Sequence, residues 1–169
     1  IRPRDWSSDV CSSDLGSVVG LTSGVSTIAS ASASTCAVTT AGAVKCWGDN
    51  SAGKLGDGSG VNKNSPVAVQ TLSSGCSAVA VGLYHACAIV QGGYVKCWGS
   101  NYYGQLGTGT GLNSASPVLV AGLGSGVKAI AANVTTTCAI DAQSVVWCWG
   151  SNNMGQVGDG TTRSEEHTS

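Results

Sequence analysis

The chain has 169 residues, of which 42% are apolar and 10% are charged, a composition typical of a globular domain and not of a disordered segment. Its 25 glycines and its lack of phenylalanine, together with many Ser, Thr, Ala and Val residues, favour short strands and tight turns over long helices. The sequence contains no apolar run of about 18 residues, which excludes an apolar membrane-spanning helix, and it shows no recognisable targeting segment.

The two ends of the chain differ in composition from its middle. Residues 1–15 (IRPRDWSSDVCSSDL) and 163–169 (RSEEHTS) hold all three Arg and both Glu. Both resemble translated sequencing-adapter sequence, with ordinary polar tails as the alternative. We therefore expect them to be non-native or disordered, and we leave them and Cys11 out of the fold prediction. The five Lys and four Asp of residues 16–162 are spread along the chain, so we expect no nucleic-acid partner, which would need clustered cations.

A repeat of 51 residues organises the middle of the chain. The recurring residues are Cys36, Cys87 and Cys138; Cys46, Cys97 and Cys148; Trp47, Trp98 and Trp149; and Gly48, Gly99 and Gly150. A fixed period of this length indicates stacked structural units. We divide the region into residues 16–66, 67–117 and 118–162, of which the last unit is truncated. We expect the Trp-Gly pairs to be structural anchors, because a large aromatic side chain at the same place in every unit packs the units together.

Each unit is expected to contain four short antiparallel strands. In the first unit, β-rich runs bounded by small turn formers predict strands at Val25–Ala31, Thr35–Thr39 and Val44–Gly48, and a fourth run follows at Pro66–Val69. We expect the proline to be the first residue of that strand or to lie on a sheet edge, since it cannot donate to a ladder. Helical apolar spacing is missing from every stretch, so the fold class is all-β.

Three segments resemble regulator-of-chromosome-condensation repeats, also called alpha-tubulin suppressor-like repeats. They are TCAVTTAGAVKCWGDNSAGKLGDG from Thr35, HACAIVQGGYVKCWGSNYYGQLGTG from His85 and TCAIDAQSVVWCWGSNNMGQVGDG from Thr137. The resemblance implies a seven-bladed β-propeller, of which this chain supplies a partial ring of about three blades. The remaining blades are then missing from this chain. Because two blade faces stay open, we expect the three units alone to be marginally stable or to associate.

The three units depart from the family pattern at a few positions. The histidine that precedes the first cysteine column is present only as His85, and Lys54 replaces the usual glutamine in the first unit. Ser144 stands where Gly42 and Gly93 turn the hairpin in the other units. If this turn needs a positive φ, the third hairpin carries strain of order ~1 kcal/mol.

Within each unit the two cysteines flank the expected hairpin turn at equal distances. Opposed residues of such a hairpin have Cα atoms about 4.5 to 5.5 Å apart, which is within reach of a disulfide. We favour three disulfides, Cys36–Cys46, Cys87–Cys97 and Cys138–Cys148, and hence an extracellular or cell-surface location. The alternatives are zinc binding, which lacks a Cys-x-x-Cys motif, and buried thiols in a reducing cell. Cys76 replaces Val25 and Val127 and is expected to be buried.

Three motifs suggest chemistry, and each has a simpler structural explanation. Residues 48–54 spell the start of a phosphate-binding loop, but Leu55 replaces the Ser or Thr that binds Mg²⁺. Asp49 and Asp57 suggest calcium ligands, but their spacing differs from the known calcium loops. His85 is the one candidate base, and its presence in a single unit indicates ordinary packing. We expect no catalytic residue, no metal and no cofactor.

A partner surface is expected where the units differ, since the fold does not dictate these positions. The variable loops are residues 49–64 and 100–116, and the second contains Tyr102 and Tyr103. Trp147 replaces Lys45 and Lys96 on the strand face opposite the cysteine. Exposed aromatic residues of this kind often anchor protein interfaces, so these three are candidate partner-surface residues.

The expected function is a non-enzymatic scaffold for protein–protein binding, with an unidentified protein as its partner. Two alternatives stay open. The blades are a targeting or structural appendage of a larger extracellular enzyme, or they act in guanine-nucleotide exchange, the activity of the founding member of the resembled family. Exchange on a small GTPase requires a reducing compartment, which the paired cysteines argue against.

Overall fold

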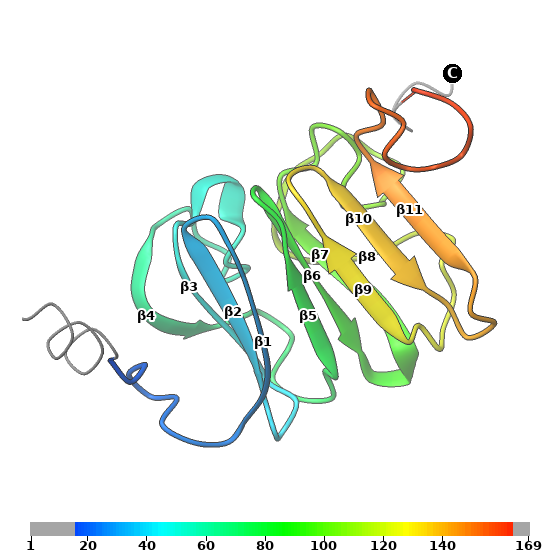
Figure 1. The fold of residues 1–169 in the computed structure, drawn as a ribbon. Helices are drawn as coiled ribbons and strands as arrows, with labels where there is room; N and C mark the ends of the chain where they lie inside the picture. Colours follow the sequence, from blue (N-terminus) through cyan, green and yellow to red (C-terminus); the bar gives the residue numbers. More distant parts are fainter. Residues whose placement is uncertain (1–15, 164–169) are drawn as a thin grey trace, which may run out of the picture.

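The computed structural model describes residues 16–163, so the expectations for residues 1–15 and for the tail beyond 163 lie outside the described residues. Within these described residues, eleven strands form three antiparallel sheets that lie side by side (Figure 1). The first sheet contains β1 (Val25–Ala31), β2 (Ser34–Thr39), β3 (Val44–Gly48) and β4 (Lys63–Ala68); the second contains β5 (Ala78–Val81), β6 (His85–Val90), β7 (Tyr94–Gly99) and β8 (Ser114–Leu119); the third contains β9 (Ala129–Ala132), β10 (Thr136–Ile140) and β11 (Val146–Gly150).

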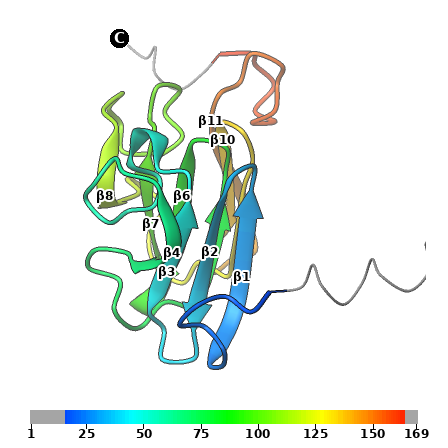
Figure 2. The same cartoon turned by 90° about the vertical axis from the view of Figure 1, so that its left-hand side faces the viewer.

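Each sheet is a blade whose strands pair with their neighbours in the sequence. The order is β1-β2-β3-β4 in the first blade, β5-β6-β7-β8 in the second and β9-β10-β11 in the third. Viewed from the side of the first blade, the sheets stand one behind another (Figure 2). Short 3₁₀ turns are present at η1 (Ser51–Gly53) and η2 (Gln91–Gly93). The predicted all-β partial propeller is therefore confirmed, and within residues 16–163 no helix is long and apolar enough to cross a membrane.

The hydrophobic core lies between neighbouring blades. Strand β6 shows why, since its side chains alternate between the two sheet faces. Ala86 and Ala88 belong to the apolar cluster shared with the first blade, whereas Cys87 and Ile89 belong to the cluster shared with the third blade. Small side chains on both faces let the sheets approach closely, which explains the high Ala, Val and Cys content of the central strands.

The fourth strand of the first blade begins earlier than its sequence predicts. We expected Pro66 at the head of the strand, but β4 starts at Lys63 and Pro66 is its fourth residue. The proline is tolerated for two reasons. Strand β4 lies at the edge of its sheet, and its register shifts between the Cys46–Val67 and Gly48–Lys63 pairs. An edge strand with an irregular ladder does not need the missing N–H.

The hairpin turn between the second and third strands of each blade needs a positive φ. The values are 78° at Gly42, 75° at Gly93 and 67° at Ser144. At the two glycines the neighbouring blade adds a second constraint, because a Cβ would lie 2.4 Å from Gly75 N or 2.5 Å from Gly126 N. Because Ser144 has a side chain and a positive φ, the third hairpin carries the expected backbone strain of order ~1 kcal/mol.

Candidate interaction surface

Three disulfides hold the central hairpins. They join Cys36 to Cys46, Cys87 to Cys97 and Cys138 to Cys148, and each pair is directly opposed in the strand register. The Cα atoms are 4.1, 4.0 and 4.1 Å apart, somewhat closer than the separation expected from hairpin geometry. The disulfide prediction is confirmed. Among the described residues Cys76 is a free, buried cysteine, and burial raises the pKa of its thiol.

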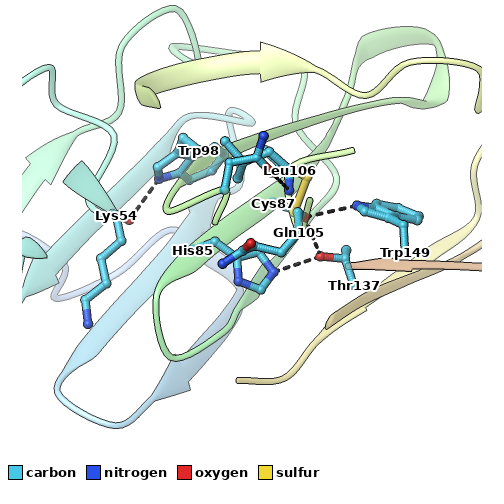
Figure 3. The surroundings of a disulfide bond; sticks show 10 residues. Lys54, His85, Cys87, Trp98, Gln105, Leu106, Thr137 and Trp149 are labelled. Atoms are coloured by element: carbon cyan, nitrogen blue, oxygen red, sulfur yellow. Dashed lines mark hydrogen bonds between the residues drawn. A yellow bond between two sulfur atoms is a disulfide. The ribbon is translucent and has the colours of Figure 1, made fainter. Parts of the chain in front are cut away.

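Tryptophans of the repeat join each blade to the one before it. Trp98 is 0% exposed, and its Nε1 donates to the backbone oxygen of Lys54, 2.9 Å away. One repeat later, Trp149 Nε1 donates to the backbone oxygen of Gln105 at 3.0 Å (Figure 3). Trp47, which has no preceding blade among the described residues, is only partly buried. The indole thus acts at the blade boundary, where it combines apolar burial with one hydrogen bond.

A buried polar network crosses the boundary between the second and third blades. His85 Nε2 lies 2.7 Å from Thr137 Oγ1, and this hydroxyl donates to the backbone oxygen of Gln105 at 2.9 Å (Figure 3). Because the hydroxyl hydrogen is used in that bond, His85 Nε2 is the donor to Thr137 and Nδ1 is the unprotonated nitrogen. Burial lowers the pKa of His85 to about 4. A neutral imidazole that is completely buried cannot reach a substrate, so its role here is in packing.

Burial of His85 predicts that the protein loses stability in mild acid. The folded-state pKa of about 4 lies below the ordinary value of 6.5, so the unfolded chain binds the proton more tightly. The contribution of neutral His85 to the free energy of unfolding is fully present above about pH 6.5 and is lost as the pH falls toward 4. At ~1.36 kcal/mol for each pKa unit, the loss reaches up to about 3 kcal/mol. Urea unfolding between pH 7 and pH 5 measures this slope.

The matched control for the acid effect is His85→Gln, which keeps a donor toward Thr137 and does not titrate. We expect its unfolding free energy to be nearly independent of pH between 7 and 5. The aspartates with lowered pKa values, Asp49, Asp57, Asp141 and Asp159, lose their stabilising contributions only at lower pH. An unchanged slope in the variant would show that His85 is not the titrating group.

Loops after β3, β7 and β11 gather at one end of the three blades (Figure 1). A buried asparagine organises each of them in the same way. In the second loop, Asn101 Oδ1 accepts from Leu106 N at 2.8 Å, Nδ2 donates to Thr108 Oγ1 at 3.1 Å, and the Asn101 N–H donates to Asn113 Oδ1 at 2.7 Å. Asn50 and Asn152 make the corresponding Oδ1 and Nδ2 contacts in the first and third loops. The loops are therefore ordered by their own side chains.

Residues that suggested phosphate or calcium binding are engaged in structural contacts. Lys54 is buried, its Nζ lies 2.6 Å from Asp49 Oδ2, and it donates to the backbone oxygen of Leu83 at 2.9 Å. Asp57 accepts from Asn50 and Ser59 and pairs with Lys63 at 3.4 Å. Among the described residues no three His, Cys, Asp or Glu side chains gather in a group that could hold a metal ion. These contacts fix the conformation of the loop.

Exposed aromatic side chains lie on the second of these loops. Tyr102 is 72% exposed and Tyr103 is 42% exposed, and their rings meet edge to face with centroids 5.1 Å apart. The Tyr103 N–H donates to Gln105 Oε1 at 2.8 Å, and Gln105 is itself completely buried at the blade boundary. We call Tyr102 and Tyr103 the tyrosine pair. The hydrogen bond from Tyr103 thus connects the tyrosine pair to the buried Gln105.

Trp147 lies on β11 of the third blade, whereas the tyrosine pair lies on the loop after β7 of the second blade. It is the second residue of β11, three residues before the loop end of the strand, which is about 10 Å at ~3.3 Å per residue. Its side chain is 49% exposed, and Nε1 donates to Asp141 Oδ2 at 2.8 Å. This hydrogen bond is the main reason that the pKa of Asp141 is lowered.

A cleft of about 660 Å³ runs beside β11. One wall contains Trp147, Cys148 and Trp149 of that strand, and the opposite wall contains the glycine-rich loop of the second blade and the connection that follows β8. We call this feature the strand cleft. It was not predicted from the sequence, because its walls come from two blades that meet only in the folded chain.

Family models of a known repeat match more than half of the chain. A family model described as "Regulator of chromosome condensation (RCC1) repeat" matches residues 41–89 and 93–140, and a second model of the same repeat matches 25–54, 76–105 and 127–156. Human "E3 ubiquitin-protein ligase HERC2" is 34% identical over 132 residues, which are 77% of this chain and 3% of that protein. The mitochondrial RCC1 domain-containing protein RUG3 of Arabidopsis thaliana is 30% identical over 143 residues, 83% of this chain and 32% of that protein.

Solved structures show the same fold. Human WBSCR16 superposes with a TM-score of 0.73 at 24% identity, over 83% of this chain and 37% of that chain. Yeast RCC1 (Prp20) superposes with a TM-score of 0.72 at 18% identity, over 85% of this chain and 36% of that chain. The chain therefore spans well under half the length of these relatives.

Proposed function

The chain belongs to the regulator of chromosome condensation repeat family, and we propose that it is a non-enzymatic scaffold that binds another protein through the loops at one end of its blades. The tyrosine pair carries this proposal. Two adjacent exposed tyrosines offer apolar area together with hydroxyl groups, a combination enriched in the anchors of protein interfaces.

Order in the loop supports the tyrosine pair as a binding feature. Asn101 holds both ends of the loop through Leu106 and Asn113, and Gln105 connects Tyr103 to the buried blade boundary. A surface that is ordered before binding loses less conformational entropy in the complex. The scaffold would therefore present its aromatic anchors without a large rearrangement.

Known binding by proteins with this fold also supports a scaffold. Yeast RCC1 (Prp20) has been solved bound to Kap60, and the structure of Prp20p was described with its binding properties to Gsp1p and histones. We expect the partner of this chain to be a protein located in the same cellular or extracellular compartment as the chain. The three disulfides support an oxidising, extracellular or cell-surface location, where such bonds form and persist.

A second candidate function is that of an appendage that targets a larger enzyme. The observation that favours it is the small part of human HERC2, 3% of its length, that this chain matches. In that ligase the similar region is one small part of a much larger protein. The appendage would use the same loop surface, so both candidates predict the same residues for binding.

The test compares protein captured by the wild-type chain and by the double variant Tyr102→Ser/Tyr103→Ala. These replacements reproduce Ser51 and Ala52 of the first loop, so the loop should keep its fold. Quantitative mass spectrometry of crosslinked extracellular fractions identifies the partner, and its affinity is then measured with purified proteins. We expect the double variant to weaken binding at least about tenfold, or ~1.4 kcal/mol.

The matched control is Met154→Ala in the third loop, which removes another exposed side chain (85% exposed) at the position equivalent to Tyr103. We expect this variant to bind like the wild type. If the double variant binds the same partner with unchanged affinity, the tyrosine pair is not the anchor and the proposal is wrong.

A further inference from the structure

We propose that Gln105 is a positioning residue for the tyrosine pair. Its side-chain amide fixes the backbone at Tyr103 and so sets the direction in which the two tyrosine rings point toward a partner. Gln105 is completely buried and touches no partner itself. This inference rests on the proposed function, because it concerns the same loop surface, and it assigns to the third blade a part in forming that surface.

The amide of Gln105 is buried although one of its polar atoms has no partner. Among the described residues, Gln105 Nε2 and His85 Nδ1 are the buried side-chain atoms without a hydrogen bond. A buried amide nitrogen in this situation gives up its hydrogen bonds to water and forms none in return. An apolar side chain of the same length would avoid that loss. Stability alone therefore does not explain a glutamine at this place.

The other end of the amide holds the loop that carries the tyrosines. Gln105 Oε1 accepts from the Tyr103 N–H at 2.8 Å. This N–H belongs to the planar peptide group between Tyr102 and Tyr103, whose orientation is determined by ψ of Tyr102 and φ of Tyr103. Both side chains leave from the Cα atoms at the two ends of this peptide group. One hydrogen bond thus orients both rings.

The first loop shows the backbone conformation that occurs without the glutamine. Lys54 stands at the position equivalent to Gln105, and a lysine side chain has no acceptor for a backbone N–H. Ala52, which is equivalent to Tyr103, has a φ of 59°. This left-handed conformation is uncommon for a residue with a side chain. Tyr103 does not adopt it.

The third loop contains the glutamine and repeats the conformation of the second. Met154 is equivalent to Tyr103, and its N–H donates to Gln156 Oε1 at 2.8 Å. Like Tyr103, Met154 is not among the non-glycine residues with a positive φ. The two loops with the amide acceptor therefore share one backbone conformation, and the loop without it has another. We infer that the acceptor selects the conformation.

The third blade holds Gln105 in place. Its backbone oxygen accepts from Trp149 Nε1 at 3.0 Å and from Thr137 Oγ1 at 2.9 Å (Figure 3). Trp149 and Thr137 are both buried residues of the third blade. The tyrosine pair of the second blade is thus positioned through a residue that the third blade anchors. A surface set in advance in this way loses less conformational entropy when a partner binds.

The test is the variant Gln105→Met in the full 169-residue chain. Methionine keeps the length of the side chain and removes the amide, including the unpartnered Nε2. We expect NMR hydrogen exchange of the Tyr103 amide to become at least about tenfold faster. The urea midpoint of unfolding should equal or exceed that of the wild type. Affinity for the protein captured by the wild-type chain should fall about five- to tenfold.

The matched control is Gln156→Met, which removes the same kind of bond in the third loop. It should accelerate exchange of the Met154 amide and leave both the Tyr103 amide and the affinity for the captured protein unchanged. The glutamine differs in one respect, since Gln156 Nε2 has partners in Ser151 Oγ and Asn153 Oδ1, each at 3.2 Å. This control shows whether the effect on binding comes from the tyrosine loop.

Two results of Gln105→Met would overturn the proposal. Unchanged exchange of the Tyr103 amide would show that Gln105 does not hold this peptide group. A lower urea midpoint together with weaker binding would give Gln105 an ordinary structural role. The variant Tyr102→Ser/Tyr103→Ala separates these failures from failure of the proposed function. If that variant binds weakly while Gln105→Met binds like the wild type, the tyrosine anchor is right and the positioning role is wrong.

Discussion

Reduction of the disulfides is expected to lower the free energy of unfolding by about 3 kcal/mol for each blade. Each bond closes a loop between cysteines 10 residues apart, and in the chain-entropy model a closed loop of this size removes about that much free energy from the unfolded state. Since Cys36, Cys46, Cys87 and Cys97 are completely buried, a reductant reaches them only when the blade opens. The two states should therefore be prepared by refolding from denaturant with and without reductant and compared in urea.

Cys76→Val provides the control for this comparison. It places in the second unit the residue found at Val25 and Val127, and it removes the free thiol without touching a disulfide. The variant should unfold at the wild-type urea concentration and should respond to reduction as the wild type does. If the reduced and oxidised proteins unfold at the same urea concentration, the disulfides do not stabilise the hairpins and the prediction is wrong.

Trp98→Ala is expected to cost about 3 to 5 kcal/mol, the range found for large buried aromatics. The substitution empties a site between the first and second blades and removes the donor to the Lys54 carbonyl. Trp47→Ala changes the same column of the repeat at a partly buried site and should cost much less. Because the two variants differ only in whether a preceding blade covers the indole, their difference measures the contribution of blade stacking.

Urea unfolding of the two tryptophan variants is the measurement, together with hydrogen exchange of β3 and β7. Trp98→Ala should accelerate exchange in the strands on both sides of the boundary. Equal destabilisation by Trp47→Ala and Trp98→Ala would show that the indole stabilises its own blade and not the contact between blades. Trp98→Phe should fall between wild type and Trp98→Ala, since it keeps one aromatic ring in the site and loses the five-membered ring of the indole with its N–H donor.

Local patterns accounted for most of the blade structure. The strand predicted at Val44–Gly48 coincides with β3, and the pairing of Cys36 with Cys46 follows from their equal distance to the turn. Both features depend on contacts within one hairpin, which the side-chain period of a strand and the position of the turn determine. The start of β4 was missed because a register shift on a sheet edge leaves no local signal at Lys63.

The polar contacts between blades were not predicted from the sequence. The network of His85, Thr137 and the Gln105 carbonyl joins residues that are far apart in the chain and meet only when the blades stack. The strand cleft was missed for the same reason, because its lining residues come from two blades that meet only in the folded chain. A signal for it was present, since Gly104 and Gly109 repeat Gly53 and Gly58, but its meaning depends on knowing that β8 lies against those glycines.

Disulfide mapping of the protein isolated from its own compartment tests the three-blade architecture and its oxidising location together. Free thiols are blocked before digestion, and crosslinked peptides are identified without reduction. We predict three crosslinks, Cys36–Cys46, Cys87–Cys97 and Cys138–Cys148, with Cys76 recovered as a blocked thiol. Crosslinks between different blades, or six blocked thiols in place of the three bonds, would contradict this architecture and location.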